Sequence, residues 1–138
     1  MKILVINGPN LNLLGKREIN IYGKQTIEEI LQSVSNKYPK VTLDYRQSNI
    51  EGELVNYLQE ANHAYDGIIL NAAAYTHTSI AIADAIAAIQ TPVVEVHISN
   101  IFAREKERHT SLISANCIGS IGGFGPASYE LAIHYFNL

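Results

Sequence analysis

Glu95 and His97 have the residue types and the spacing of a general acid and the carboxylate that orients it. They end a short apolar run, and side chains two residues apart on a β-strand point to the same face. A carboxylate beside an imidazole selects its tautomer, which makes the ring an effective general acid or base. The alternative interpretation is a structural ion pair at the end of a strand.

Further polar residues follow three apolar runs of the sequence, at residues 2–7, 67–70 and 93–97. If these runs are parallel strands of one sheet, the segments after them meet at its carboxyl edge, where such sheets bind ligands. Each residue must be weighed against a local capping or surface role, because loops carry polar residues anyway. The candidates at this edge are Asn10, Arg17, Tyr22, Asn71, His77, Glu95, His97, Ser99, Arg104 and Arg108.

Arg104 and Arg108 lie four residues apart and would share one face if their segment is helical. Two guanidinium groups on one face suit a carboxylate or a phosphate. The acidic neighbours Glu105 and Glu107 fit a solvated, charged helix equally well. The sequence leaves both interpretations open.

His77, Glu95 and His97 also suit divalent iron or zinc, since two histidines and a carboxylate form a known ligand set. No closely spaced motif such as His-x-x-x-His supports a metal site. The glycine after the first apolar run lacks a dinucleotide-binding pattern, and no Walker motif occurs. We therefore expect no metal, no nucleotide and no organic cofactor.

Hydrophobic periodicity divides the chain into alternating strands and helices. Strands are predicted at residues 2–7, 41–45, 67–70, 93–97 and 117–121. Thr26 and Glu29 form a Thr-x-x-Glu capping box, which begins a helix that reaches Tyr38. Further helices are predicted at residues 51–61, from Ser79 to Ile89, and after Pro126.

Five strands that alternate with helices predict an α/β fold with a parallel sheet, because parallel neighbours need right-handed crossovers. We predict a flavodoxin-like three-layer sandwich with strand order 2-1-3-4-5 and helices on both faces. One domain over residues 1–138 is expected from the length. The predicted ligand site lies between the first and third strands.

The composition is that of an ordinary globular chain, with 47% hydrophobic residues, 17% charged residues and a net charge of -3. No stripe of Lys and Arg suits nucleic acid, and no apolar run reaches the roughly 18 residues of a membrane span. The one cysteine, Cys117, has no partner for an internal disulfide, and the N-terminus lacks a signal-peptide pattern. We expect no nucleic acid, no membrane and a cytoplasmic location.

Five separated blocks of sequence surround the candidate residues. They are NGPNLNLLGKR at residues 7–17 with Tyr22-Gly23, QSNIEGE at 47–53, YTHTS at 75–79, EVHISN at 95–100 and ARE at 103–105. In this order they resemble the type II 3-dehydroquinate dehydratases over nearly the whole chain. The resemblance implies a flavodoxin-like fold, conversion of 3-dehydroquinate to 3-dehydroshikimate, and a homododecamer of four trimers. Aromatic biosynthesis by the shikimate pathway and quinate breakdown both fit this reaction.

The resemblance also implies roles for residues. Tyr22 would take a proton from the carbon next to the ketone, and Arg17 beside it would favour the phenolate by its charge. Asn10 would stabilise the developing enolate oxygen. His97, oriented by Glu95, would protonate the departing hydroxyl as general acid.

The remaining implied roles concern binding and closure. Arg104 would support the site, Asp84 would reach the site of a neighbouring subunit, and Gly15 and Gly23 would bracket a lid. The substrate's carboxylate and hydroxyls would be bound by Asn71, His77, Ile98, Ser99 and Arg108.

The chain departs from the family pattern at three places. Ala72-Ala73 stands where Pro-Gly is usual, Ile19 where Pro is common, and Ile50 where His is common. The first departure leaves the loop geometry beside Asn71 open. None of the three touches a group with a chemical role.

Three other functions remain as alternatives. A lysine Schiff base is the other solution to this reaction, but it uses a barrel of about 250 residues. A noncatalytic binder of a small anion would keep the polar edge without turnover. A flavin-binding electron carrier would share the architecture.

Overall fold

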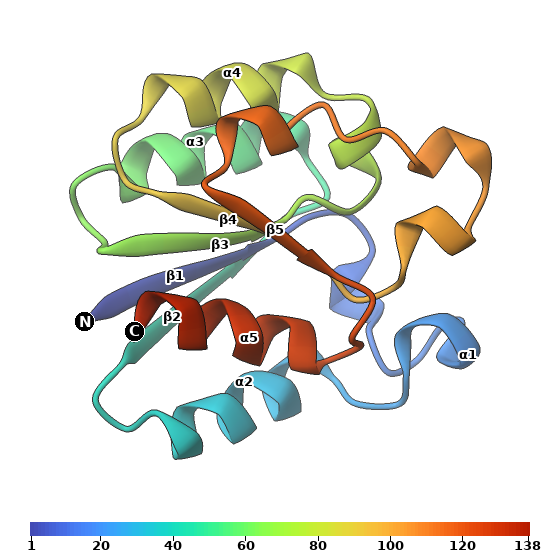
Figure 1. Ribbon diagram of the computed structural model, residues 1–138, viewed down its shortest axis with the longest axis horizontal. Helices are drawn as coiled ribbons and strands as arrows, with labels where there is room; N and C mark the ends of the chain where they lie inside the picture. The colour runs from blue at the N-terminus through green and yellow to red at the C-terminus, as the bar shows by residue number, and fades with distance from the viewer.

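The computed structural model describes residues 1–138, which form three layers (Figure 1). The middle layer is a five-stranded sheet in the order β2-β1-β3-β4-β5, with every neighbouring pair parallel. The predicted order and parallel pairing are confirmed. The strands are β1 (Lys2–Asn7), β2 (Thr42–Gln47), β3 (Gly67–Asn71), β4 (Val93–His97) and β5 (Gly119–Gly122).

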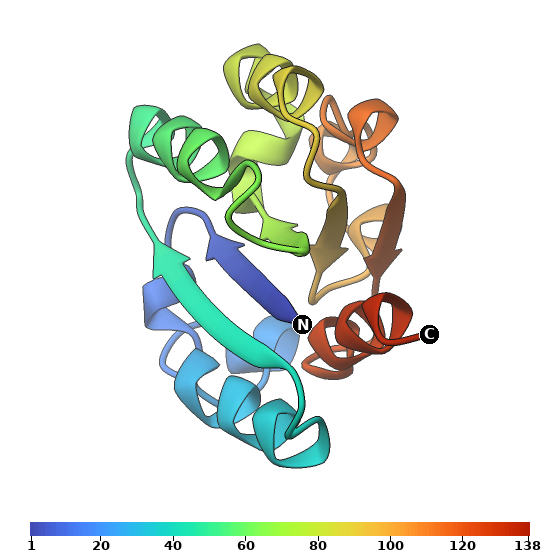
Figure 2. The same cartoon turned by 90° about the vertical axis from the view of Figure 1, so that its left-hand side faces the viewer.

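Helices cover both faces of the sheet. In Figures 1 and 2, α3 and α4 lie on one face and α2 and α5 on the other. Short 3-10 helices occupy several loops, among them η2 (Ala73–His77), η3 (Ile101–Ala103) and η4 (Lys106–Arg108). The α-helices are α1 (Ile19–Tyr22), α2 (Ile27–Lys37), α3 (Glu51–Ala61), α4 (Ile80–Ala88) and α5 (Ala127–Phe136).

Side-chain alternation along β1 explains why the sheet has two cores. Ile3 and Val5 pack with residues of α2 and α5, whereas Leu4 and Ile6 pack with residues of α3 and α4. Successive strand residues point to opposite faces, so a strand buried on both faces must be apolar throughout. The nearly continuous apolar run at the N-terminus therefore becomes a central strand.

Local capping begins two of the helices. Thr26 Oγ1 accepts a hydrogen bond from the Glu29 backbone N–H at 3.2 Å, as the predicted capping box requires. Ser79 Oγ accepts from the Ile82 N–H at 2.9 Å at the start of α4. Both hydroxyls satisfy a backbone donor that the first turn of a helix leaves unpaired.

The last strand begins later than predicted. β5 begins at Gly119, so Cys117 precedes it instead of lying within it. The Cys117 backbone N–H bonds to Ser114 O, which closes a short 3-10 turn before the strand. The cysteine side chain is half-buried against the core on the α3 and α4 face, and burial raises the pKa of its thiol to about 12.

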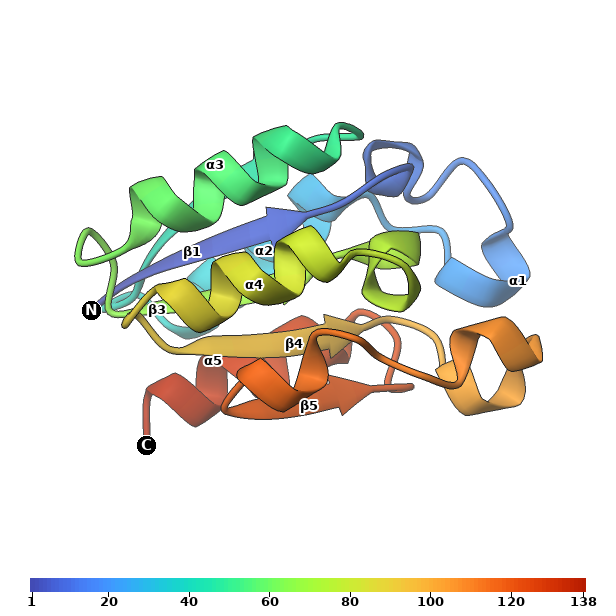
Figure 3. The same cartoon turned by 90° about the horizontal axis from the view of Figure 1, so that it is seen from above.

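All five strands point the same way, so their following loops gather at one end of the molecule. Figure 3 shows α1, η3 and η4 beyond the arrowheads of the strands. No helix of the structure has the length and apolar character needed to cross a lipid bilayer.

Candidate active site

The end of β4 holds the predicted acid and carboxylate in hydrogen-bond contact. His97 Nε2 lies 2.7 Å from Glu95 Oε2, and the two residues are 6% and 0% exposed. Ser111 Oγ donates to the same carboxylate oxygen at 2.7 Å. Glu95 and His97 thus share a face of the strand, as predicted, and form a buried, hydrogen-bonded pair.

The electrostatics of Glu95 favour its ionised form. Burial acts to raise the pKa of the carboxyl, but hydrogen bonds from His97 and Ser111 outweigh it and leave the pKa below the usual value. An ionised Glu95 accepts a hydrogen bond from the Nε2–H of His97. This leaves the other ring nitrogen, Nδ1, free of the carboxylate.

His77 lies beside His97 with its own tautomer fixed. Its Nδ1 is 2.8 Å from the backbone oxygen of Thr110, which can only accept, so Nδ1 carries the proton. The two imidazole rings are stacked, with centroids 6.3 Å apart. Burial lowers the pKa of His77, and the nearby His97 and Arg108 lower it further against the raising effect of the Thr110 hydrogen bond, which favours the neutral ring with Nε2 as an acceptor.

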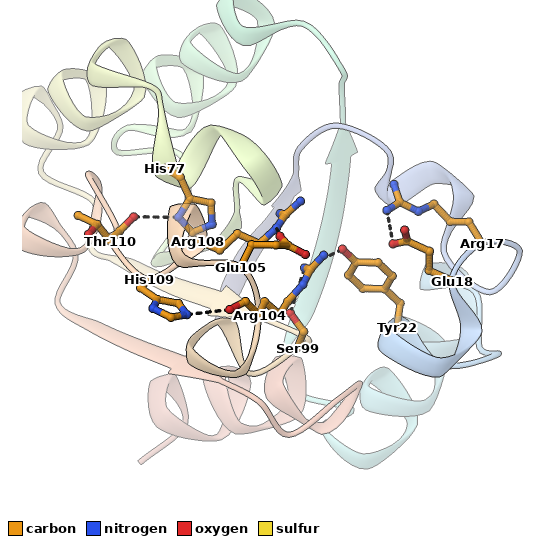
Figure 4. Close-up of polar contacts among 10 residues, drawn as sticks. All are labelled: Arg17, Glu18, Tyr22, His77, Ser99, Arg104, Glu105, Arg108, His109 and Thr110. Atoms are coloured by element: carbon orange, nitrogen blue, oxygen red, sulfur yellow. Dashed lines mark hydrogen bonds and ion pairs between the residues drawn. The ribbon is translucent and has the colours of Figure 1, made fainter.

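Tyr22 lies across from this pair, at the end of α1. Arg104 Nη1 donates to the Tyr22 hydroxyl at 2.9 Å, and the Arg104 and Arg17 guanidinium carbons lie 5.4 and 5.1 Å from the ring centre. Figure 4 shows Tyr22 between the two arginines, with its hydroxyl directed at Arg104. The group that contacts the phenol oxygen is therefore Arg104.

Arg17 is beside the Tyr22 ring, as predicted, but its guanidinium is engaged elsewhere. Its Nη2 donates to Glu18 Oε2 at 2.5 Å. That hydrogen bond lowers the pKa of the exposed Glu18 carboxyl. In this conformation Arg17 neutralises an acidic neighbour and acts on Tyr22 only through its position over the ring.

The segment that carries Arg104 and Arg108 is not one helix, so the condition for a shared helical face is not met. Arg104 lies in the turn between η3 and η4, and its backbone oxygen accepts a hydrogen bond from the His109 ring at 2.9 Å. Arg108 Nε donates to Glu105 at 2.6 Å. Two short 3-10 turns replace one helix and still bring both guanidinium groups to the same cavity.

One cavity at the carboxyl edge collects the predicted residues, apart from Glu95, which lies behind His97, and Asp84, which is exposed on α4. The predicted residues that line it are Asn10, Arg17, Tyr22, Asn71, His77, His97, Ile98, Ser99, Arg104 and Arg108. The sequence did not single out the apolar residues of the wall, because a loop carries no hydrophobic periodicity. These are Pro9, Leu11, Leu14, Ala73, Ala74 and Ile101.

The block at residues 47–53 supports the cavity from behind. Asn49 Oδ1 accepts from the Asn10 backbone N–H at 3.0 Å, and Asn10 has a left-handed φ of 69°. Gln47 Nε2 donates to the Gly8 carbonyl at 3.2 Å. The Tyr75 hydroxyl donates to the Asn49 carbonyl at 2.8 Å. The turn after β2 therefore holds the loop that carries Asn10.

The Ala72-Ala73 departure is accommodated beside Asn71. Ala73 takes a left-handed φ of 53°, which glycine adopts more readily than alanine. A Cβ on Gly8 would lie 2.5 Å from the Ala72 carbonyl oxygen, so the two loops are in close backbone contact. Alanine thus follows the path that glycine usually takes, at some cost in backbone strain.

No three His, Cys, Asp or Glu side chains are grouped as metal ligands. His97 Nε2 faces Glu95, and His77 Nδ1 faces a backbone carbonyl. The ligand set that the sequence left open is therefore not assembled by this geometry.

Comparison with known proteins gives consistent matches over almost the entire chain. The model of a family described as dehydroquinase class II matches residues 1–137. A protein of Exiguobacterium named 3-dehydroquinate dehydratase is 56% identical over 135 residues, covering 97% of this chain and 92% of its own length. One of Campylobacter jejuni with the same name is 53% identical over 135 residues, covering 96% and 85%.

Solved structures agree with these sequence matches. A type II dehydroquinase from Butyrivibrio crossotus aligns with a TM-score of 0.95 and 45% identity, covering 100% of this chain and 98% of that one. A type II dehydroquinase from Propionibacterium acnes aligns with a TM-score of 0.92 and 40% identity, covering 97% and 94%.

Proposed function

This chain belongs to the class II dehydroquinase family, and from that premise we propose that it eliminates water from 3-dehydroquinate through an enolate, with Tyr22 as base and His97 as acid. The observation that supports these roles is that both side chains line one cavity. Each is bonded to a charged partner that suits its role, Arg104 for Tyr22 and Glu95 for His97.

The first step is removal of a proton from the carbon next to the ketone. A phenolate is a strong enough base for this, and a guanidinium at 2.9 Å stabilises its negative charge. Arg17 adds positive charge over the ring. The pair of electrons left on carbon moves to the ketone oxygen, where a donor held by Asn10 stabilises the enolate.

The second step expels the hydroxyl group. The enolate electrons re-form the carbonyl and break the carbon–oxygen bond, while His97 gives its proton to the departing oxygen, which leaves as water. Glu95 stabilises the protonated ring beforehand. At the end Tyr22 holds one proton more and His97 one fewer, so one proton must return to His97 before the next turnover.

Binding uses the remaining polar lining of the cavity. The neutral His77 offers Nε2 as an acceptor for a substrate hydroxyl. Asn71, Arg108 and the segment Ile98–Ser99 supply donors for the carboxylate and the other hydroxyls. Each contact positions the substrate between the two proton-transfer groups.

We further propose that α1 closes over the substrate, and that twelve chains assemble as four trimers in the cytoplasm. Gly15 and Gly23 both have positive φ, 89° and 83°, and bracket the segment that carries Tyr22. Asp84 is exposed and does not line its own cavity, which fits a role at a neighbouring site. Native mass spectrometry tests the assembly, since a monomer at working concentration contradicts it.

A direct assay tests the proposed reaction. Mixing the protein with 3-dehydroquinate should produce the ultraviolet absorbance of the conjugated enone of 3-dehydroshikimate. Saturable binding without this absorbance would instead indicate a noncatalytic binder. A yellow colour of the purified protein would favour a flavin carrier.

A trapping experiment tests the mechanism separately. Borohydride added with substrate should leave the activity intact, because neither proposed step forms an imine. A lysine adduct in the mass spectrum would replace the enolate mechanism by a Schiff base. Activity that is lost with a chelator and restored by a divalent ion would contradict the assignment of both steps to side chains alone.

A further inference from the structure

Asn71, one of the proposed binding residues, belongs to a buried chain of hydrogen bonds. The Ala73 backbone N–H donates to Asn71 Oδ1 at 3.2 Å, and Asn71 Nδ2 donates to the Tyr129 hydroxyl at 3.0 Å. Tyr129 in turn donates to Asn7 Oδ1 at 2.8 Å. Asn7, Asn71 and Tyr129 are 0%, 3% and 0% exposed, so water does not replace these partners.

The sheet register explains how these residues meet. Asn7 and Asn71 are paired at the ends of β1 and β3. Strand alternation gives both the same orientation as Val5 and Ile69, which pack on the face covered by α5. Tyr129 lies on α5 and packs in that same core. One helix side chain therefore contacts the last residues of two central strands.

The direction of every bond in this chain follows from one backbone group. The Ala73 N–H can only donate, so Asn71 must turn its oxygen to Ala73 and its nitrogen to Tyr129. Tyr129 accepts from that nitrogen, and its single proton goes to Asn7. A flipped Asn71 amide would set its nitrogen against the Ala73 N–H, which is also a donor, and would draw the Tyr129 proton away from Asn7 Oδ1.

The arrangement leaves one donor of Asn71 unused by the protein. An amide nitrogen has two hydrogens, and Tyr129 takes one of them. No acceptor in the chain bonds to the second, and Asn71 lines the cavity. Burial raises the pKa of Tyr129 far above that of a free phenol, so its proton stays in place and the bond directions hold across neutral pH.

We propose that Tyr129, together with Asn7, is a positioning residue: the Ala73 N–H sets the direction of the Asn71 amide, and the Tyr129 hydroxyl holds its nitrogen end in place, so that the second N–H of Asn71 is presented to an oxygen of the bound substrate. The identity of that substrate, 3-dehydroquinate, rests on the proposed function. The site recognises an acceptor at this point, because Asn71 cannot turn its own oxygen to the ligand without breaking two buried hydrogen bonds.

Substitution Tyr129→Phe tests the proposal, because it removes the hydroxyl and keeps the ring. We expect KM for 3-dehydroquinate to rise about tenfold and kcat to stay within about twofold, since the lost contact serves binding. Tyr65→Phe is the matched control. It removes one hydroxyl bond, to Asp44 at 2.6 Å, and Tyr65 does not line the cavity. KM should be unchanged in this control.

A double-mutant cycle separates positioning from general loss of structure. Tyr129→Phe should add nothing to the KM of the Asn71→Ala variant, because its effect passes through Asn71. Full additivity of the two changes overturns the proposal. An unchanged KM in Tyr129→Phe, or an equal rise in Tyr65→Phe, overturns it as well.

Neutron diffraction from deuterium-exchanged crystals tests the bond directions without a variant and without activity. The Tyr129 deuteron should lie between its oxygen and Asn7 Oδ1, and an Asn71 deuteron should point to Tyr129. A Tyr129 deuteron directed at Asn71 overturns the proposal. If the protein does not convert 3-dehydroquinate, the proposed function fails, and this measurement still decides the orientation of Asn71.

Discussion

The two sides of the cavity differ in what holds their proton-transfer group. His97 ends a central strand, is buried, and is bonded to a carboxylate that Ser111 also contacts. Tyr22 ends α1, a helix of four residues with no buried member, and the N-cap residue Glu18 before it has a left-handed φ of 39°. The proposed acid is thus positioned within the core, whereas the proposed base lies on a surface segment from which the Tyr22 ring packs half-buried against the core.

Arg104 connects the two sides of the cavity. It follows η3 on the acid side, yet its Nη1 bonds to the Tyr22 hydroxyl on the base side (Figure 4). Its guanidinium also lies 3.4 Å from Ser99 Oγ. The contact joins the segment after β4 to α1, and it supplies the charge that a phenolate needs. The hydroxyl of the proposed base is therefore held from the side of the cavity that carries His97.

The largest effect should follow from removing the base. Tyr22→Phe should lower kcat about 10²- to 10⁴-fold, the usual contribution of one acid–base group. The free energy of unfolding should change by no more than about 0.5 kcal/mol, because phenylalanine keeps the half-buried ring that packs against the core and loses only the hydroxyl. Tyr38→Phe, which removes a hydroxyl contact to His134 away from the cavity, is the control for both assays. Near-normal turnover by Tyr22→Phe would remove Tyr22 from its role.

The next largest effect distinguishes Arg104 from Arg17. Arg104→Met should lower kcat about 10- to 100-fold, because a hydrogen bond to a charged group is worth roughly 1.5–3 kcal/mol. Arg17→Met should cost less, since Arg17 is bonded to Glu18 and not to the phenol oxygen. Steady-state kinetics of the two variants provide the comparison. A larger loss in Arg17→Met would mean that Arg17 leaves Glu18 when substrate binds.

Substitution Glu95→Gln tests the side of the cavity that carries His97. We expect kcat to fall about tenfold, because a neutral amide no longer stabilises the protonated His97 ring. The folded pKa of Glu95 is lowered, so its ionised form stabilises the fold fully above about pH 4.5, the ordinary value, and this contribution is lost as the pH falls through the folded pKa. Urea unfolding at a series of pH values should show that the free energy of unfolding falls less at low pH in Glu95→Gln than in the parent protein. An equal fall in both proteins would contradict a stabilising role of ionised Glu95.

The smallest effect concerns Gly23, the proposed hinge of the segment that carries Tyr22. Gly23 has φ 83° and ψ -178°, a region that only glycine occupies readily, although a Cβ there would meet no atom within 4 Å. Gly23→Ala should therefore strain the backbone by about 1–3 kcal/mol without a clash. We expect this cost to appear mainly as a higher KM, because Gly23 adjoins Tyr22 in the wall of the cavity.

Gly52→Ala is the matched control for the hinge. Gly52 lies in α3, also with open space around an added Cβ, so alanine should stabilise the protein by up to about 1 kcal/mol. Thermal unfolding and KM measured on both variants separate the two effects. If Gly23→Ala lowers the free energy of unfolding by the full backbone strain, the segment that carries Tyr22 unfolds together with the core.

Much of the fold was predictable because hydrophobic periodicity reports which face of an element is buried. The bounds of β1, α3 and β4 follow directly from the apolar patterns, and the cap at Thr26 follows from its spacing to Glu29. The pairing of Glu95 with His97 was equally local, since two residues on one strand must share a face. These features depend only on neighbours within a few positions along the chain.

Contacts between distant segments were decided by the tertiary structure alone. The bond from Arg104 to Tyr22 joins residues 82 positions apart, and that from Asn71 to Tyr129 joins residues 58 apart. The sequence left open whether the segment of Arg104 and Arg108 is helical, and it did not indicate that Arg104 contacts the Tyr22 hydroxyl. A residue pattern determines which way a side chain faces from its own element. Which partner it meets there depends on how the elements pack and twist, and no local pattern encodes that.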